Sequence, residues 1–343
     1  MVFSAADYRQ RLSQFTEQHR VPMLKVFFTV DTEIWCGGWD DLEGKFPEAF
    51  QRYIYGPTDQ GNYALPMTME ILSDHGIKGV FFVEPLFATR FGLAPLQEIV
   101  DLIQTAGHEI QLHLHTEWVD EACDGTLPAI DNKRENIREF SQVDQSTLIG
   151  AGLSLLRSAG ASPINAFRAG NYGLNAATLA ALAENGIDFD TSYNAAAEIG
   201  VDDVAPGEIL TQPRRFSTVI EYPVTVYRDR GGNSLRQFQL NACSFSEIAK
   251  ILTTAVDMGW ESVVIVSHNF ELLNQRKNRP DPIVVRRFRK LCRYLETNRD
   301  RFEITGFTGL QKPDERLQPA PFASSMWDTY GRSAEQLVRR AFW

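Results

Sequence analysis

The sequence predicts an α/β fold with a parallel sheet, and two observations support this prediction. Short apolar runs of strand type alternate with helical patterns from residue 24 onward, which is the arrangement of βα units. The helical segments between these runs also carry clear end signals. The strand-like runs are residues 24–30 (LKVFFTV), 79–83 (GVFFV), 108–114 (HEIQLHL), 164–168 (INAFR), 217–224 (STVIEYPV) and 262–268 (SVVIVSH).

Three helices are predicted from apolar residues that recur at helical spacing and stop at a glycine. The third helix also opens with a capping box, from Ser244 to Glu247. The apolar positions are Leu96, Ile99, Val100 and Ile103 before Gly107, then Leu179, Leu182 and Ala183 before Gly186, and finally Ile248, Ile251, Leu252 and Ala255 before Gly259.

The composition is that of an ordinary globular protein. The chain has 343 residues, of which 43% are hydrophobic and 23% charged, so it can bury a sizeable core. Its net charge of -10 argues against a nucleic-acid surface, because binding phosphates needs clustered lysine and arginine. The basic residues Arg286, Arg287, Arg289 and Lys290 have helical spacing and are interpreted as one solvated helix face.

Signals for export and for membrane insertion are not found in the sequence. The first residues contain no apolar run of signal-peptide type, and no stretch approaches the roughly 20 apolar residues of a membrane span. We therefore expect a cytoplasmic protein without a membrane span. The four cysteines, Cys36, Cys123, Cys243 and Cys292, form no CxxC pair, so reduced thiols are expected.

One catalytic domain is expected over residues 24–310. An N-terminal helical extension (1–23) precedes it, and a C-terminal tail (311–343) follows it. After Leu310 the tail turns polar and contains prolines, and it ends in aromatic residues. The tail could pack on the domain or on a second subunit, so a homo-oligomer stays open.

Two carboxylates follow the first predicted strand. In barrels and open α/β sheets, reactive groups gather where strands end. Alternation along FFTVDTE puts Asp31 and Glu33 on one face and Thr32 on the other. A lone aspartate at this place would most often cap a turn, whereas two carboxylates on one face favour metal binding or proton transfer.

A second group of polar residues lies in GHEIQLHLHTEW. His113, His115 and Glu117 occupy alternate positions at the end of this strand. Imidazole and carboxylate groups on one face can close around a divalent cation such as zinc. A single histidine is more often a core or surface group, but three ligand-type residues at this spacing are seldom accidental. His108, at the start of the strand, is interpreted as structural.

Arg168 and His268 end two further strands. Arg168 could hold a carboxylate through its planar fork of donors, although a surface salt bridge is the ordinary alternative. His268 follows a run of buried-strand type, and a histidine there can act as a general acid or base near neutral pH.

Taken in order, the motifs TVDTE, GHEI with its histidines, FRAG, and the late strand with its histidine resemble those of the polysaccharide deacetylase (NodB-homology) family. The resemblance covers residues 24–310. It implies a distorted (β/α)7-type barrel of about seven strands that holds one divalent metal ion, expected to be zinc. The implied activity is hydrolysis of an N-acyl group on an amino sugar, with a carbohydrate or another N-acylated small molecule as substrate.

The resemblance also implies roles for individual residues. Asp31 matches the catalytic base, Arg168 the residue that orients it, and His268 the acid that protonates the leaving amine. His113 matches the first metal histidine. Asp190 is the nearest match to the acidic residue that tunes the late histidine.

Two departures from the family pattern leave the metal shell open. The family has Asp-Asp in its first motif, whereas here the second acid comes one residue later, at Glu33. The second metal histidine of the family lies four residues after the first, a position that is Glu117 here, with His115 between. We expect His113 with Glu33 or Asp31, completed by His115 or Glu117.

Candidate substrate-binding residues lie beside these motifs. Trp35 and Trp118 could stack on a sugar ring or pack within loops. Asn171 and Tyr172 follow Arg168 in the third motif. Two other functions stay open, namely hydrolysis of a different C–N bond, as in a formamide or a ureide, and non-catalytic glycan binding.

Overall fold

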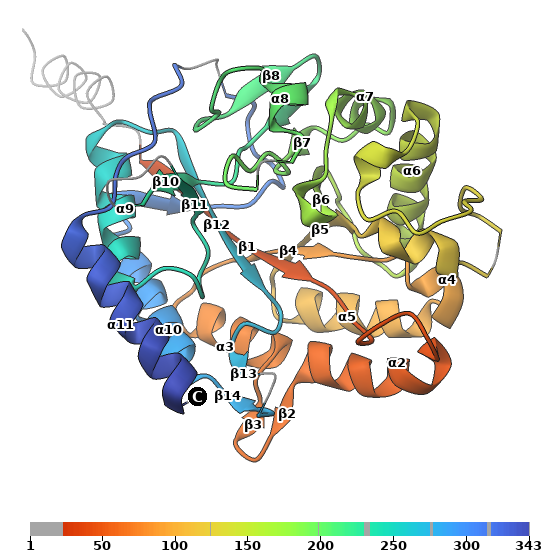
Figure 1. The fold of residues 1–343 in the computed structure, drawn as a ribbon, viewed down its shortest axis with the longest axis horizontal. Helices are drawn as coiled ribbons and strands as arrows, with labels where there is room; N and C mark the ends of the chain where they lie inside the picture. The colour runs from red at the N-terminus through yellow and green to blue at the C-terminus, as the bar shows by residue number, and fades with distance from the viewer. Residues whose placement is uncertain are drawn as a thin grey trace, which may run out of the picture.

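The structure is a computed structural model that describes residues 23–123, 125–197, 199–229, 234–274, 277–313 and 317–342. The helical extension predicted for residues 1–23 lies outside the described residues, except for Met23. Figure 1 shows the strands near the centre of the molecule and the helices around them.

A nine-stranded sheet forms the centre of the fold. Its order is β12-β1-β4-β5-β6-β7-β9-β8, and β15 pairs with the first residues of β1. All neighbours are parallel except β8 and β9 at one edge. The strands are β1 (Leu24–Thr32), β4 (Val80–Val83), β5 (Glu109–Leu114), β6 (Ala166–Ala169), β7 (Phe189–Asp190), β8 (Arg214–Phe216), β9 (Val219–Glu221), β12 (Ser262–His268) and β15 (Phe302–Ile304).

Helices connect successive strands, as the alternation predicted. The helices are α2 (Leu42–Phe50), α3 (Leu65–Asp74), α4 (Ala88–Phe91), α5 (Ala94–Thr105), α6 (Gln142–Ser158), α7 (Ala176–Glu184), α8 (Val201–Val204), α9 (Phe245–Asp257), α10 (Pro282–Thr297) and α11 (Met326–Phe342). Shorter turns are η1 (Gln51–Tyr55), η2 (Thr116–Glu121), η3 (Ile137–Glu139) and η4 (Gly170–Tyr172). Two-stranded ribbons pair β2 (Pro57–Thr58) with β3 (Gly61–Asn62), β10 (Val226–Arg228) with β11 (Leu235–Gln237), and β13 (Leu273–Asn274) with β14 (Arg279–Pro280).

The predicted elements are present. Each of the six strand-like runs contains a strand, although the run 217–224 forms only the short β9. The three predicted helices are α5, α7 and α9. The capping box of α9 is formed as well, because the Ser244 hydroxyl accepts a hydrogen bond of 3.3 Å from the Glu247 backbone N–H.

The parallel sheet curls into the predicted distorted barrel, and an irregular segment spans its open side. Val224 N–H donates to the Tyr193 carbonyl (2.9 Å), just after β7, and Thr225 N–H donates to Val264 in β12 (3.4 Å). The segment before α9 continues this contact, since Val266 N–H donates to Phe238 (3.0 Å). These bonds join the two ends of the run of parallel strands.

Apolar side chains fill one end of the barrel interior. Phe27 on β1 belongs to this inner cluster, and alternation puts Thr29 and Asp31 on the same inward face. The interior therefore changes from apolar to polar toward the carboxyl ends of the strands. The cluster consists of Phe27, Val80, Phe82, Ala166, Phe189, Ile220, Tyr222, Val264 and Phe307.

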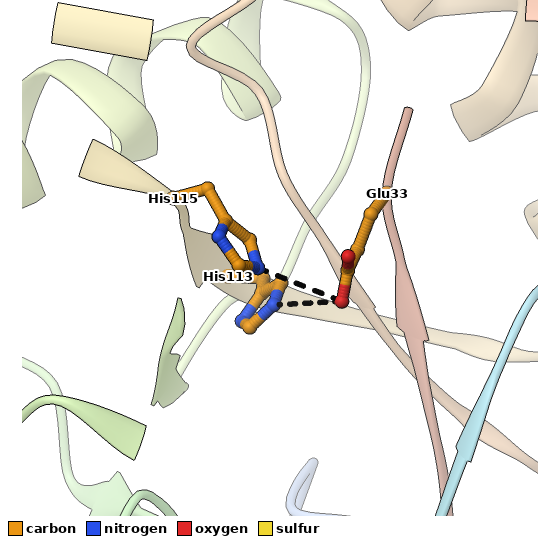
Figure 2. Close-up of side chains that lie close together, drawn as sticks. All are labelled: Glu33, His113 and His115. Atoms are coloured by element: carbon orange, nitrogen blue, oxygen red, sulfur yellow. Dashed lines mark ion pairs between the residues drawn. The ribbon is translucent and has the colours of Figure 1, made fainter. Parts of the chain in front are cut away.

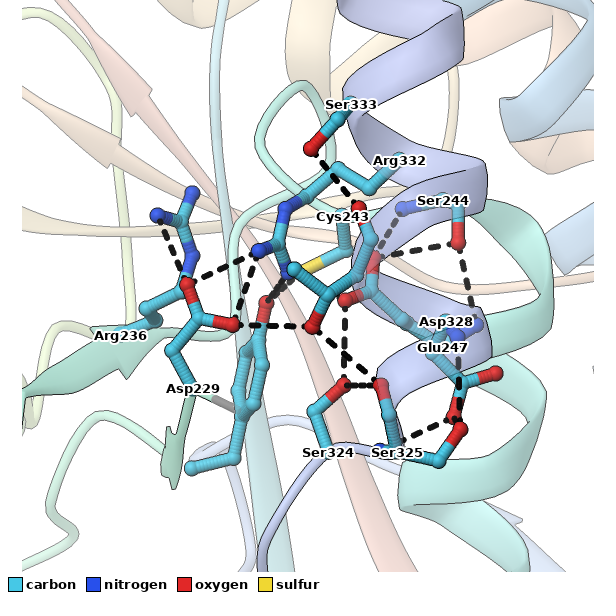
Figure 3. A network of polar contacts seen from close by, with 12 residues as sticks. Asp229, Arg236, Cys243, Ser244, Glu247, Ser324, Ser325, Asp328, Arg332 and Ser333 are labelled. Carbon is cyan, nitrogen blue, oxygen red and sulfur yellow. Dashed lines mark hydrogen bonds and ion pairs between the residues drawn. The ribbon is translucent and has the colours of Figure 1, made fainter. Parts of the chain in front are cut away.

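The C-terminal tail packs on the domain through α11, which was one of the two arrangements left open. Arg332 on α11 is buried and donates to both carboxylate oxygens of Asp229 (2.9 Å each) and to Glu247 of the α9 capping box (Figure 3). The boundaries predicted for the domain and the tail stay predictions.

The prediction of one solvated basic face on α10 is wrong at Arg287. Arg286, Arg289 and Lys290 are exposed, but Arg287 is only 5% exposed. Its guanidinium donates to the Leu240 carbonyl (2.8 Å) and to Glu335 of α11 (2.6 Å). Packing of α11 across α10 causes this burial.

The structure also bears on the expectations about membrane spans and cysteines. None of the helices in this part of the chain has the length and apolar character that crossing a membrane requires. The four cysteines are free thiols, as predicted.

We predict that Arg332→Ala lowers the free energy of unfolding by about 3 kcal/mol, because it leaves the buried Glu247 without its cation. Urea unfolding measures the change. Arg289→Ala on exposed α10 surface is the control and should shift stability by less than about 0.5 kcal/mol. Equal losses in the two variants would contradict the role given to Arg332.

Candidate active site

The polar motifs meet at the carboxyl ends of the parallel strands. In the register of β1 with β12, Asp31 lies opposite His268. In the register of β5 with β6, His113 lies opposite Arg168. Residues far apart in the sequence are therefore brought together by the sheet, at the end of the barrel where the polar interior begins.

Glu33, His113 and His115 form a buried cluster (Figure 2). The Nε2 atoms of His113 and His115 lie 3.7 Å and 3.5 Å from the same Glu33 carboxylate oxygen. These distances are too long for good hydrogen bonds. One potential ligand atom from each side chain lies within 4.8 Å of the others, so the three can close around a single cation.

Hydrogen bonds on the far side of each imidazole orient the two histidines. His113 Nδ1 lies 2.7 Å from the Arg168 carbonyl oxygen, which can only accept, so Nδ1 carries the proton and Nε2 keeps a lone pair. That Nε2 atom is buried and has no hydrogen-bond partner in the part of the chain that the structure describes. A buried nitrogen with a free lone pair, beside a second imidazole and a carboxylate, fits a divalent metal ion.

Glu117 supports His115 from behind. Its carboxylate lies 3.2 Å from His115 Nδ1 and accepts a hydrogen bond of 3.0 Å from the Asn171 side-chain amide. Glu117 is absent from the cluster of potential ligand atoms, whereas His115 belongs to it. Asn171, a predicted substrate-binding residue, also donates to the Glu135 carbonyl (3.0 Å), so its amide is engaged within the protein.

The charges in the cluster are strongly coupled. Burial disfavours the charge on Glu33, but the charge of His115 and the contacts with both histidines outweigh burial and hold the pKa of Glu33 well below its ordinary value. Burial also opposes the charge on His115, yet Glu33 and Glu117 raise the pKa of His115 well above its usual range. The cluster thus stabilises positive charge at its centre.

Arg168 holds Asp31 beside this cluster. The Arg168 guanidinium is fully buried and donates to the Asp31 carboxylate (2.6 Å) and to the Thr29 hydroxyl (2.9 Å). It also donates to the Thr191 carbonyl (3.1 Å) and lies 4.5 Å from the centre of the Phe82 ring. Because all of these contacts lie inside the barrel, Asp31 has little freedom to turn.

His268 is the third histidine that lies near Glu33. Its Nε2 atom is 3.6 Å from the Glu33 carboxylate, and its Nδ1 is 3.0 Å from Glu271. Burial opposes the charge on His268, but the hydrogen bond to Glu271 and the charges of Glu33 and Asp31 raise its pKa to about 9. His268 is therefore held as a proton donor at neutral pH.

Two buried carboxyl groups beside the site were missed in the sequence. Glu271 is the acidic residue that contacts His268. The resemblance matched Asp190 to this role, but Asp190 accepts a hydrogen bond from Ser192 (2.5 Å) and lies beside Glu221. Glu84 follows β4, and burial raises its pKa to about 8. The position of Glu271, three residues after His268, was a signal that could have identified it.

The aromatic residues predicted to bind substrate differ in their distance from the metal ligands and in their burial. The Trp35 ring meets the His115 ring edge-on, with centroids 4.8 Å apart, and its indole N–H donates to Glu33. Trp118 is only 2% exposed and packs against Trp39, with centroids 4.9 Å apart. Stacking of Trp118 on a sugar does not fit this packing. The Tyr172 hydroxyl is buried, and none of the described residues forms a hydrogen bond with it.

Among known proteins, the chain matches solved structures. No protein-family model matches the sequence, and no curated protein matches it. A provisionally assigned polysaccharide deacetylase from Mycobacterium smegmatis is 18% identical, with a TM-score of 0.54 over 86% of this chain and 96% of that chain. At this identity the likeness shows a shared fold, which confirms the fold that the motifs implied.

More distant structures also match. A family 4 carbohydrate esterase from Streptomyces lividans is 13% identical, with a TM-score of 0.40 over 82% of this chain and 91% of that chain. A CE4 family pseudoenzyme from Bacillus anthracis is 10% identical, with a TM-score of 0.39 over 83% of this chain and 64% of that chain. We draw no conclusion from these two likenesses.

We predict that His113→Ala abolishes binding of a divalent metal, because it removes the buried lone pair that faces Glu33. Elemental analysis of the purified variant measures the metal content. His108→Ala, which removes another buried histidine outside the cluster, is the control and should retain the metal. A variant at His113 that keeps a full complement of metal would exclude this ligand.

Proposed function

We propose that the chain is a member of the polysaccharide deacetylase family and hydrolyses an N-acyl group, most simply N-acetyl, on an amino sugar or a sugar-containing precursor. The observation that carries the proposal is the convergence of three histidine Nε2 atoms on one Glu33 oxygen, with Asp31 beside them. The distances are 3.7 Å from His113, 3.5 Å from His115 and 3.6 Å from His268. The shared fold is consistent with it. The cytoplasmic location stays a prediction.

Glu33, His113 and His115 would hold the metal ion, for which zinc suits a mixed set of imidazole and carboxylate ligands. When bound, such an ion supplies a Lewis acid and lowers the pKa of a coordinated water. Glu117 positions His115, and the Arg168 carbonyl positions His113, so the two Nε2 atoms stay directed at Glu33.

Asp31 is the proposed general base. The hydrogen bond from Arg168 (2.6 Å) fixes one carboxylate oxygen. A charged carboxylate beside the metal ligands can take a proton from the attacking water. Arg168 itself has its donors engaged inside the barrel and acts as a positioning residue.

His268 is the proposed general acid. Its Nε2 atom lies 3.6 Å from Glu33, and Glu271, 3.0 Å from its Nδ1, favours the protonated form. When the carbon–nitrogen bond breaks, His268 can give its proton to the departing nitrogen. The base and the acid therefore act from different strands, β1 and β12.

A related hydrolase of another C–N bond is the second candidate, because Glu33 replaces the aspartate of the family's first motif. A panel of N-acetylated sugars, formamides and ureides separates the two candidates by which product is released. Metal uptake without turnover of any of these compounds would favour the third candidate, a non-catalytic glycan-binding protein.

We predict that Asp31→Asn and His268→Ala each lower kcat by at least about 100-fold, because each removes one proton-transfer group. Metal content should stay unchanged in both variants, since neither side chain belongs to the proposed ligand set. Acetate release and elemental analysis of the same preparations measure the two quantities. Near-normal turnover in either variant would reject the role of that residue.

We also predict that Glu271→Gln shifts the alkaline limb of the pH–rate profile to lower pH. Glu271 raises the pKa of His268, and the reaction needs His268 protonated, so a lower pKa ends activity earlier as pH rises. Initial rates across the alkaline range measure the shift. An unchanged alkaline limb would show that His268 is not the group that titrates there.

A further inference from the structure

The Tyr172 hydroxyl group is a buried hydrogen-bond donor. It has no hydrogen-bond partner among the described residues, although its oxygen is buried. Tyr172 belongs to the turn that directly follows β6, and its neighbour Asn171 donates to Glu117, which contacts the proposed metal ligand His115. A buried polar group without a partner is uncommon in folded proteins and calls for an explanation.

The backbone holds Tyr172 in an unusual conformation. Asn171 and Tyr172 have φ values of 54° and 57°, in the left-handed region that bulky residues seldom adopt. Hydrogen bonds fix this turn: the Asn171 amide donates to Glu117 (3.0 Å), and Leu174 N–H donates to the Tyr172 carbonyl (3.0 Å). The turn starts directly after β6, so it is attached to the strand that carries Arg168.

The close approach of this turn to the metal site leaves no room for a larger residue. A Cβ atom added to Gly170 would lie 2.7 Å from the Leu114 carbonyl oxygen and 2.8 Å from His115 Nδ1. The glycine therefore lets the turn lie against β5 and His115.

The phenol stays protonated. Burial first, and then the negative charges of Asp31, Glu33 and Glu271, raise the pKa of Tyr172 far above its ordinary value. A neutral phenol can donate a hydrogen bond without giving up its proton.

Other donors near Tyr172 are already engaged within the protein. Arg168 donates to Asp31 and Thr29, and the Trp35 indole donates to Glu33. His268 is assigned to the leaving nitrogen. The Tyr172 hydroxyl, in contrast, has no partner among the described residues and can donate to an oxygen of the substrate.

We propose that the Tyr172 hydroxyl donates a hydrogen bond to the acyl carbonyl oxygen of the substrate and stabilises the negative charge that develops there. The inference rests on the proposed function. The water oxygen forms a bond to the carbonyl carbon, and the electron pair of the C=O double bond moves onto the oxygen that Tyr172 contacts. Asp31 takes the water proton. The electron pair on the oxygen then re-forms the C=O bond as the C–N bond breaks, and the nitrogen keeps the C–N electron pair and receives a proton from His268. Tyr172 keeps its own proton throughout.

The first test compares Tyr172→Phe with Tyr222→Phe. Tyr222 carries another buried hydroxyl without a partner, but it lies in the apolar cluster inside the barrel, which makes it a matched control. Loss of a donor to a developing oxyanion should lower kcat of Tyr172→Phe by about 100-fold and leave KM and zinc content nearly unchanged. Tyr222→Phe should behave like the wild type.

Two results of this test would overturn the assignment. A rise in KM with unchanged kcat would place the hydroxyl on a part of the substrate that does not react, such as a sugar hydroxyl. Normal kinetics of Tyr172→Phe would remove the residue from the reaction.

A binding measurement separates this inference from the proposed function. Acetate, which resembles the product of N-acetyl hydrolysis, is titrated into the zinc-loaded wild type and Tyr172→Phe by calorimetry, and the variant should bind about tenfold more weakly. Weaker acetate binding without turnover of any N-acyl sugar would reject the proposed function and keep the assignment. Turnover with equal acetate binding would reject the assignment alone, and a wild type that neither turns over substrate nor binds acetate would reject both.

Discussion

The buried guanidinium of Arg168 is the interaction on which the rest of the site depends. It reaches across the barrel from β6 to β1, where it meets Asp31 and Thr29, and it also contacts the segment after β7. The backbone carbonyl of the same residue orients His113 on β5. A charge with no exposure to water is tolerated only when it is paired, so removal of Asp31 would leave a costly isolated cation. One residue thus fixes the proposed base and the first histidine together.

The interior of the barrel is divided along its axis. Aromatic and aliphatic side chains fill one end, and side chains of the same strand faces become polar toward the carboxyl ends. The polar end is also shielded from water, since Glu33, His113 and His115 are all buried. Electrostatic interactions are stronger in such surroundings. The fold therefore provides a rigid base for the site. It also shields the site from water, so a cation and a proton-transfer pair interact more strongly there.

Much of this arrangement could be predicted from the sequence, because alternation along a strand is a local property. It put Asp31 and Glu33 on one face, and the strand ends located Arg168 and His268. Alternation could not decide which of His115 and Glu117 faces Glu33. The chain leaves β5 at Leu114 and turns into η2, so Glu117 swings behind His115 instead of continuing the alternation.

The remaining differences arise from contacts that are distant in the sequence. Arg287 is buried because α11 packs across α10, and Trp118 is buried because aromatic side chains from other segments surround it. No periodic pattern records these two contacts, so composition and spacing did not reveal them. Glu271 is different, because it lies three residues after His268, and the turn that follows β12 places it against His268 Nδ1.

The central claim is that the cluster of Glu33, His113 and His115 binds a divalent metal used in N-acyl hydrolysis. The most direct measurement is acetate release from N-acetylated sugars by the full chain before chelation, after chelation and after zinc is restored. We expect release that is lost with the metal and regained with it. A protein that takes up no metal and releases no acetate under any of these conditions would contradict the claim.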